Sequence, residues 1–250
     1  MRTGRAASPP RHAAGPARRA VSAPRHEAAP ARHAVAPSAT ALAPVLLAAL
    51  ALLALVPATA TARAPDAGLV DVLTAAPTIR ADVRYATSNN FTGARLPGYC
   101  AARALLLPDA ARRLARVQRS LRSDGLGLKV FDAYRPARAS RAMVRWARRT
   151  GRGSLLSDGY IAARSNHNLG TTVDLTLVRL SDGRELGMGT AFDAFTVRST
   201  TLRAHGPVRR NRLALKRAME AHGFRNYARE WWHYDSVRPG PRRLDLPIGC

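Results

Sequence analysis

The sequence has little lysine, few acidic residues, two cysteines and one long apolar run. Lysine makes up only 2 of the 40 basic residues, and with 16 acidic residues the formal charge is +24. The bias towards arginine, together with abundant alanine, is typical of a high-GC coding background, so we interpret most of this charge as solvated surface. No RNP, zinc-finger or helix-turn-helix pattern accompanies it, which argues against specific nucleic-acid binding. Weak association with anionic cell-envelope material is a secondary expectation.

The single long apolar run lies near the N-terminus. Residues 1–38 are rich in Ala, Pro, Arg and His and are expected to be disordered, and an uninterrupted apolar stretch follows at 45–56. A stretch this short matches the hydrophobic region of a signal peptide better than a membrane span, although an uncleaved anchor is the competing interpretation. We therefore expect residues 1–62 to be a basic leader. Residues 63–250 are then one exported domain in the periplasm, at the cell surface or secreted.

The scarcity of cysteine limits the chain to one internal bridge. Cys100 and Cys250 are compatible with a disulfide in an exported protein, and two unpaired buried thiols are the alternative. Because a cysteine at the last position is rarely buried for packing, we expect the two to be linked.

Helix and strand patterns are mixed in the rest of the chain. A helix is predicted from Pro108, with Leu114, Val117 and Leu121 on its apolar face. The remaining predictions are strands at 78–85, 128–133, 172–180, 185–189 and 230–234, helices at 137–149 and 208–222, and a loop at 151–164. Strands and helices do not alternate regularly, so we predict an α+β fold, a single domain with a central, mainly antiparallel sheet flanked by helices.

Two polar segments contain the candidate metal ligands and the candidate catalytic base. His167 and Asp174 lie seven residues apart in the stretch 165–174, and both side chains reach one cleft if the histidine lies on a loop and the aspartate on the next strand. Much later, Glu230 and His233 lie three residues apart. Two imidazoles and a carboxylate form a three-ligand set for a catalytic zinc, whose fourth position stays open for water. Glu230 would then be the base beside that water.

A single histidine is more often a satisfied surface or core residue than a ligand. Residues 63–250 contain four histidines. His167 lies in a segment of Ser, Asn, Gly and Thr that neither a helix nor an apolar core requires, and His233 lies in an aromatic-rich run whose only acid partners are Glu230 and Asp235. The two segments together therefore indicate a metal site in a cleft beside the sheet more strongly than either would alone.

Five segments between Asp82 and Asp235 carry further motifs, and they are Asp82–Thr87, Asp132–Pro136, Ser165–Asp174, Met188–Asp193 and Glu230–His233. In this order they resemble the VanX-type D-alanyl-D-alanine dipeptidases, a family of zinc metallopeptidases. The resemblance implies an enzyme that binds one zinc ion per chain through His167, Asp174 and His233. It also implies that Glu230 is the general base and then the general acid.

The resemblance extends to residues around the substrate. It implies that Arg135 steadies the oxyanion of the tetrahedral intermediate, although a surface arginine is the ordinary alternative. Asp193 would hold the free ammonium of a dipeptide, with a turn or capping aspartate as the alternative. Ser165 is expected beside the substrate or as a helix cap, and Tyr85 is expected either to line the pocket or to be a core aromatic.

The expected function is hydrolysis of D-alanyl-D-alanine to two D-alanines in cell-wall dipeptide turnover. The nearest alternative is a zinc D,D-carboxypeptidase or L,D-endopeptidase that acts on peptidoglycan stem peptides, for which Asp193 would not close the amino side of the cleft. A second alternative is a non-catalytic envelope-binding module with a structural zinc, which has no need for Glu230. A nucleic-acid binder is the most distant alternative and predicts binding that falls steeply with salt. The sequence does not set the oligomeric state.

Overall fold

The computed structural model describes residues 68–250, which lie within one compact unit. The strands are β1 (Val70–Asp71), β2 (Arg80–Ala81), β3 (Leu105–Leu106), β4 (Leu126–Asp132), β5 (Thr172–Arg179), β6 (Phe224–Asn226) and β7 (His233–Ser236). The α-helices are α1 (Val72–Ala75), α2 (Pro108–Leu121), α3 (Ala137–Arg149), α4 (Ser154–Ser157) and α5 (Gly206–Ala221). The short 3-10 helices are η1 (Arg84–Ala86), η2 (Arg122–Asp124), η3 (Asn166–Leu169), η4 (Val197–Ser199) and η5 (Thr201–Arg203).

The leader predicted at residues 1–62, with its apolar run at 45–56, lies outside the described residues. Among residues 68–250, no helix is both long and apolar enough to cross a membrane.

A five-stranded sheet in the order β2-β4-β5-β7-β6 forms the centre of the fold. Only the β2–β4 pair is parallel; β4, β5, β7 and β6 pair antiparallel with their neighbours. The central strand β5 is buried at every residue except its last, because both of its faces are covered. The predicted α+β class with a mainly antiparallel sheet is confirmed.

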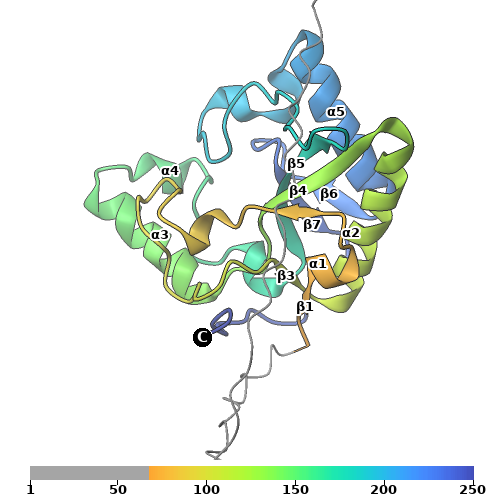
Figure 1. Cartoon of the computed structure of the whole chain (residues 1–250). Helices are drawn as coiled ribbons and strands as arrows, with labels where there is room; N and C mark the ends of the chain where they lie inside the picture. Colours follow the sequence, from red (N-terminus) through yellow and green to blue (C-terminus); the bar gives the residue numbers. More distant parts are fainter. Residues whose placement is uncertain (1–67) are drawn as a thin grey trace, which may run out of the picture. The chain divides into compact units, whose positions relative to one another are not determined.

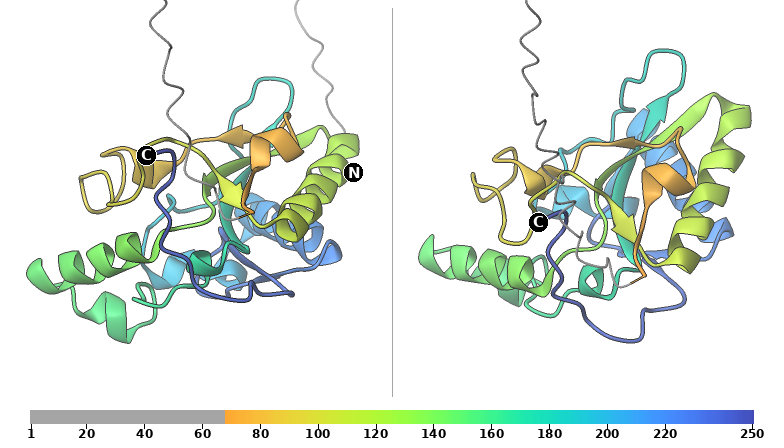
Figure 2. Two further views of the ribbon diagram at one scale, coloured as in Figure 1. Left: turned by 90° about the horizontal axis from the view of Figure 1, so that it is seen from below. Right: turned by 60° about the horizontal axis from the view of Figure 1, so that its bottom comes forward.

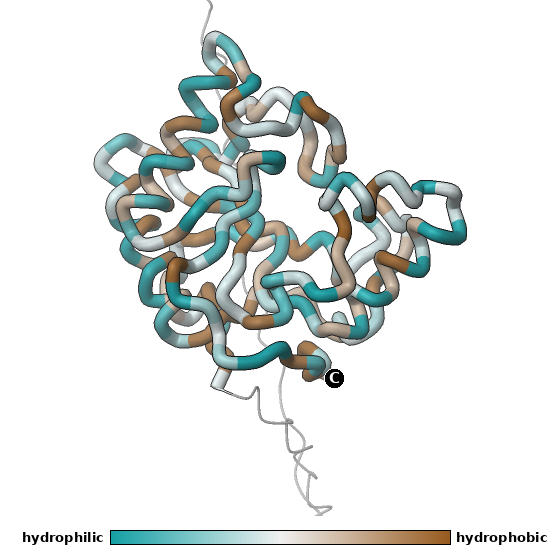
Figure 3. The backbone as a smooth tube through the Cα atoms, turned by 180° about the vertical axis from the view of Figure 1, so that it is seen from behind, coloured by the Kyte–Doolittle hydropathy of each residue, from teal (hydrophilic) through white to brown (hydrophobic). Residues whose placement is uncertain are grey.

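Helices lie on both sides of this sheet. Figures 1 and 2 show α2 and α5 together on one side, with α3 and α4 on the far side from them. Leu114, Val117 and Leu121 are buried on α2, as are Leu215 and Met219 on α5, so the apolar faces predicted for these helices are confirmed. Hydrophilic and hydrophobic stretches alternate along the helical parts of the tube in Figure 3, as they do in amphipathic helices.

Some of the predicted strands are shorter in the structure. The strand predicted at 78–85 pairs with β4 only at Arg80–Ala81, because the chain then leaves the sheet and forms η1, which buries Tyr85. The return strand predicted at 185–189 is reduced to one bridge between Glu185 and Val178. The segment 151–164, predicted as loop, contains the single turn α4.

The strand predicted at 230–234 begins three residues later than expected. The backbone N–H of His233 donates to the carbonyl of Glu230 at 3.3 Å, and this bond closes a turn before β7 starts. Because of this turn, Glu230 lies outside the sheet while its side chain stays near that of His233.

The C-terminal segment is fastened to the body of the domain. The disulfide expected between Cys100 and Cys250 is present, with the two Cα atoms 5.1 Å apart. Ile248 is fully buried, and the Tyr134 hydroxyl donates to the carbonyl of Leu246 at 3.0 Å and accepts from its N–H at 2.8 Å. Residues 246–250 therefore pack against the segment that carries Arg135.

Candidate metal centre and active-site cleft

The three predicted metal ligands come from neighbouring elements of the sheet and from one adjoining turn. Asp174 is the third residue of β5 and lies directly opposite His233, the first residue of β7, in the antiparallel register. Facing residues on adjacent antiparallel strands have their side chains close together. His167 lies on η3, immediately before β5, so the chain carries its imidazole to the same end of the sheet.

A glycine makes the step from η3 into β5 possible. Gly170 has a φ of +70°, and a Cβ at this position would come within 2.8 Å of Leu69. The left-handed conformation and the close contact both favour glycine here. This turn sets His167 and Asp174 side by side.

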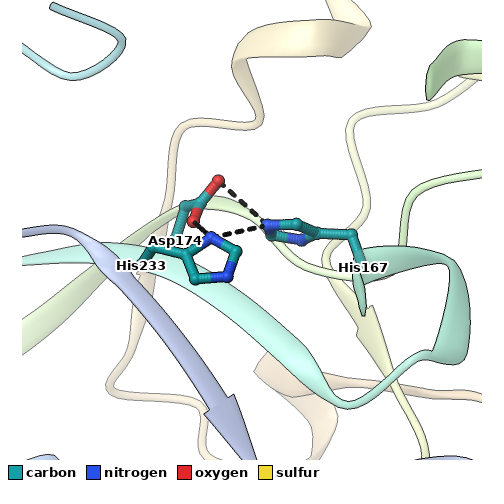
Figure 4. Close-up of side chains that lie close together, drawn as sticks. All are labelled: His167, Asp174 and His233. Atoms are coloured by element: carbon teal, nitrogen blue, oxygen red, sulfur yellow. Dashed lines mark hydrogen bonds and ion pairs between the residues drawn. The ribbon is translucent and has the colours of Figure 1, made fainter. Parts of the chain in front are cut away.

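Figure 4 shows the side chains of His167, Asp174 and His233 pointing towards one another. The Nε2 atom of His167 lies 3.2 Å from Asp174 Oδ2 and 3.3 Å from Nδ1 of His233. The Nδ1 atom of His233 lies 3.0 Å from Asp174 Oδ1. One potential ligand atom from each residue lies within 4.8 Å of the others, a spacing that suits a single cation.

The outer ring nitrogens of both histidines already have acceptors. Nδ1 of His167 lies 2.6 Å from the carbonyl oxygen of Ala133, and Nε2 of His233 lies 3.3 Å from a carboxylate oxygen of Asp235. In neutral imidazoles these nitrogens carry the protons, so the inner nitrogens present lone pairs to one another and to Asp174. Asp174 Oδ1 is buried without a hydrogen-bond donor. A cation between these facing acceptors satisfies all of them, so the residues fit a metal ion.

Arg135 lies beside the ligands and is held by a buried carboxylate. Its Nε and Nη2 atoms lie 2.9 and 2.8 Å from Oδ2 of Asp132, and Nη2 is 3.6 Å from Asp174 Oδ2. Its guanidinium also stacks over the ring of Tyr85, 4.9 Å from the ring centroid. Only 8% of Arg135 is exposed, and this part lines the cleft, so its orientation is fixed before any substrate arrives.

Glu230 reaches the ligands from the turn before β7. Its Oε2 atom lies 3.7 Å from Nδ1 of His233. Burial raises the pKa of Glu230 to about 8. A cation held by the three ligands would lower this pKa again, because an opposite charge favours the carboxylate. A buried carboxyl group of this kind can both accept and return a proton near neutral pH.

Asp193 and Tyr85 form another polar pair in the cleft. The Tyr85 hydroxyl lies 3.1 and 3.0 Å from the two carboxylate oxygens of Asp193. Burial and then the nearby Asp174 carboxylate raise the pKa of Asp193 well above its usual range. An ammonium group placed beside Asp193 would favour its ionised form.

The predicted site residues line one cleft of about 240 Å³. Ser165 lines it and also accepts a hydrogen bond from the N–H of His167 at 3.3 Å, so it caps η3 as expected, and its place beside the substrate stays a prediction. The aromatic walls come from four separate segments of the chain. They are Phe91, Tyr160, Phe195, Tyr227 and Trp232. The remaining two described histidines, His205 and His222, do not line the cleft.

Two supporting aspartates were not identified as site residues from the sequence. Asp132 is fully buried and faces Asp174 in the register of β4 and β5. Its Oδ2 atom accepts hydrogen bonds from Arg135 and lies 3.4 Å from Nδ1 of His167. Asp235 pairs with His233 and accepts a hydrogen bond from Thr172 at 2.7 Å. Asp235 lies two residues after His233 in β7, so its side chain points to the same face of the sheet, and this spacing could have identified it from the sequence. Asp132 lies three residues before Arg135, a spacing that alone indicates no pairing.

A family model described as D-Ala-D-Ala dipeptidase, Peptidase_M15, matches residues 65–243. The chain belongs to this family. It is 38% identical over 203 residues to the D-alanyl-D-alanine dipeptidase of Streptomyces coelicolor, which covers 73% of this chain and 98% of that protein. It is 36% identical over 174 residues to the enzyme of the same name from Enterococcus faecalis, covering 64% of this chain and 86% of that protein.

Membership of the D-Ala-D-Ala dipeptidase family confirms that the chain is an enzyme and a metallopeptidase, as its resemblance to that family implied. The dipeptidase of the same name from Escherichia coli is 36% identical over 169 residues, covering 67% of this chain and 83% of that protein. The alternative of a non-catalytic envelope-binding module is therefore wrong.

Proposed function

We propose that the protein is an exported zinc dipeptidase that hydrolyses D-alanyl-D-alanine to two D-alanines in cell-wall dipeptide turnover. The observation that carries this proposal is the arrangement of the cleft. Three facing metal ligands and Glu230 line the same cleft as Asp193, a carboxylate that could pair with a free ammonium. A dipeptide has its ammonium next to the scissile bond, whereas a stem peptide continues beyond that point.

Each residue near the ligands has a proposed task. Zinc held by His167, Asp174 and His233 would lower the pKa of a bound water to about 7 and polarise the substrate carbonyl. Glu230 takes a proton as the water oxygen adds to the carbonyl carbon. It then gives that proton to the leaving amine as the C–N bond breaks.

The remaining polar groups hold the substrate and its charges. Arg135 is a fixed cation aimed at the cleft, and it stabilises the negative charge that develops on the carbonyl oxygen. Asp193 pairs with the ammonium of the first D-alanine, with its position supported by the Tyr85 hydroxyl. Ser165 presents its hydroxyl at the rim beside the metal ligands.

Export is supported by two independent features. The apolar run at 45–56 has the length of a signal-peptide core, and the Cys100–Cys250 disulfide suits an oxidising compartment. Mass spectrometry of alkylated protein from the envelope and culture medium should find the linked pair. Recovery of the chain only from the cytoplasm, with two free thiols, would contradict export.

Release of D-alanine from two substrates tests the activity. The zinc-loaded protein should hydrolyse D-Ala-D-Ala and leave a pentapeptide ending in D-Ala-D-Ala intact. Turnover of the pentapeptide would assign the protein to the D,D-carboxypeptidases instead. Release of D-alanine from neither substrate, with zinc bound, would remove the proposed hydrolytic function.

A further inference from the structure

Arg212 on α5 is a buried cation outside the cleft. Only 1% of it is exposed, and no carboxylate of the described residues forms an ion pair with it. Burial of a charge without a counter-ion is costly unless hydrogen bonds satisfy the group. The guanidinium of Arg212 is therefore stable at this position only if its N–H groups donate hydrogen bonds to the protein.

The hydrogen bonds of Arg212 all go to one segment of the chain. Its Nε donates to the carbonyl of Met188 at 2.8 Å. Its Nη1 donates to the carbonyls of Arg198 at 3.0 Å and Thr200 at 2.9 Å. One rigid guanidinium therefore holds both ends of the excursion from 188 to 200, a task that the planar fork of arginine suits.

This segment carries part of the cleft. Residues 188–200 contain no strand and only the short turn η4, yet they place Asp193 and Phe195 in the lining. Asp193 has a φ of 60° and is the only non-glycine residue with positive φ among those described. Such a conformation is strained and persists only where the surrounding structure enforces it.

A glycine allows the 188–200 segment to pack closely against α5. Gly189 has a φ of +80°, and a Cβ there would come within 2.7 Å of Val208 and 3.4 Å of Arg212 Nη2. Only glycine lets the backbone lie this close to the helix. The carbonyl of Met188 is thereby brought within reach of the buried guanidinium.

The same segment is tied to the turn that carries Glu230. The backbone N–H of Trp231 donates to the carbonyl of Ser199 at 3.1 Å, and its indole N–H donates to the Thr190 hydroxyl at 2.8 Å. The segment is therefore fixed on one side by Arg212 and on the other by the residue next to Glu230. The distance between Asp193 and the three proposed metal ligands therefore depends on the hydrogen bonds of Arg212 and on those of Trp231.

We propose that Arg212 is a positioning residue that sets substrate-length selectivity by holding the 188–200 segment, and with it Asp193, at a fixed distance from the metal ligands. This assignment rests on the proposed dipeptidase function. Arg212 acts through the backbone that it holds and does not touch the substrate. Its loss should weaken recognition of the free ammonium and leave the metal ligands in place.

Kinetics of the zinc-loaded Arg212→Met and Arg212→Lys variants test this role. We expect the KM for D-Ala-D-Ala to rise about tenfold or more while kcat changes less, because ammonium binding is disturbed and the metal side is not. We also expect the preference for D-Ala-D-Ala over N-acetyl-D-Ala-D-Ala to fall. Arg217→Met, at an exposed position on the same helix, is the matched control and should leave both quantities unchanged.

Amide hydrogen exchange gives a readout that does not need activity. Peptides covering 188–201 should exchange faster in both Arg212 variants, whereas peptides from β5 should not. Arg212→Lys keeps the charge without the planar fork and serves if Arg212→Met does not fold. A lower melting temperature with unchanged KM, selectivity and local exchange would reduce Arg212 to a purely structural residue. If the wild-type protein releases no D-alanine, the proposed function fails, and the exchange comparison still decides whether Arg212 holds the segment.

Discussion

The cleft has a metal side, formed by the three proposed ligands and the residues behind them, and an ammonium side, formed by Asp193 as the proposed contact of the substrate ammonium. These two sides are built in different ways. Asp132, Asp174 and His233 lie in register across the adjacent strands β4, β5 and β7, so the sheet itself spaces the metal side. Asp193, in contrast, lies in an irregular segment, and Tyr85 and Arg212 hold that segment from outside the sheet. On the proposed mechanism, the metal ligands are thus held mainly by the sheet, whereas the residue that would select the substrate is held by an irregular segment outside it.

This difference predicts separate kinetic effects. Changes on the metal side should lower kcat or zinc affinity, whereas changes on the ammonium side should raise KM. The predictions below run from the largest expected effect to the smallest.

Glu230→Gln should lower kcat by about 10²- to 10⁴-fold, the usual contribution of a general acid–base group. The amide keeps the size of the side chain but can neither accept nor return the proton. Zinc content, measured by elemental analysis, should remain at the wild-type level because Glu230 is not one of the three ligands. Wild-type turnover in this variant would remove Glu230 from the mechanism.

Asp132→Asn should lower zinc affinity by about 10- to 100-fold, together with kcat, because groups behind the ligands orient them. The asparagine keeps the shape of the side chain but loses the charge that holds Arg135 and faces His167. Tyr99→Phe is the matched control, since it removes only the 2.6 Å hydrogen bond to the other oxygen of Asp132. Equal effects of the two substitutions on zinc affinity would show that the charge has no special role.

Asp193→Asn should raise the KM for D-Ala-D-Ala about tenfold with little change in zinc affinity, because a charge-assisted bond to the ammonium is lost. Asparagine tolerates a positive φ, so the backbone of the segment should keep its conformation. Steady-state kinetics beside a zinc titration separate the two effects. A fall in zinc affinity without a change in KM would place Asp193 on the metal side.

Cys100→Ser and Cys250→Ser should have the smallest effect on kcat, because the disulfide lies outside the cleft. Each should destabilise the fold by about 2–5 kcal/mol, as loss of a native disulfide that closes a long loop does. Urea unfolding of the oxidised wild type and of each variant measures this change. An unchanged unfolding midpoint would mean that residues 246–250 are held by Ile248 and Tyr134 without the bridge.

The sequence predicted the parts of the site that are local in the chain. His167 and Asp174 are joined by one turn, and Glu230 and His233 by another, so spacing alone brings each pair together. The apolar faces of α2 and α5 were likewise predictable from helical periodicity. The resemblance to a known family added Arg135, whose surroundings spacing does not indicate.

The remaining features depend on contacts between distant parts of the chain. Asp132 meets His167 from 35 residues away because β4 pairs with β5, and Arg212 meets Met188 across a separation of 24 residues. Neither residue type is unusual in a sequence with 38 arginines and 16 acidic residues, so pattern alone does not single them out. The strand predicted at 230–234 was wrong at its start because a turn hydrogen bond competed with the β pattern.

Titration of zinc into the metal-free protein tests the central claim most directly. Release of D-alanine from D-Ala-D-Ala should rise in proportion to added zinc and reach its plateau at one equivalent per chain, as three facing ligands with one open position predict. Full activity in the presence of a strong chelator, or no activity with one equivalent of zinc bound, would contradict the account of a single hydrolytic zinc centre.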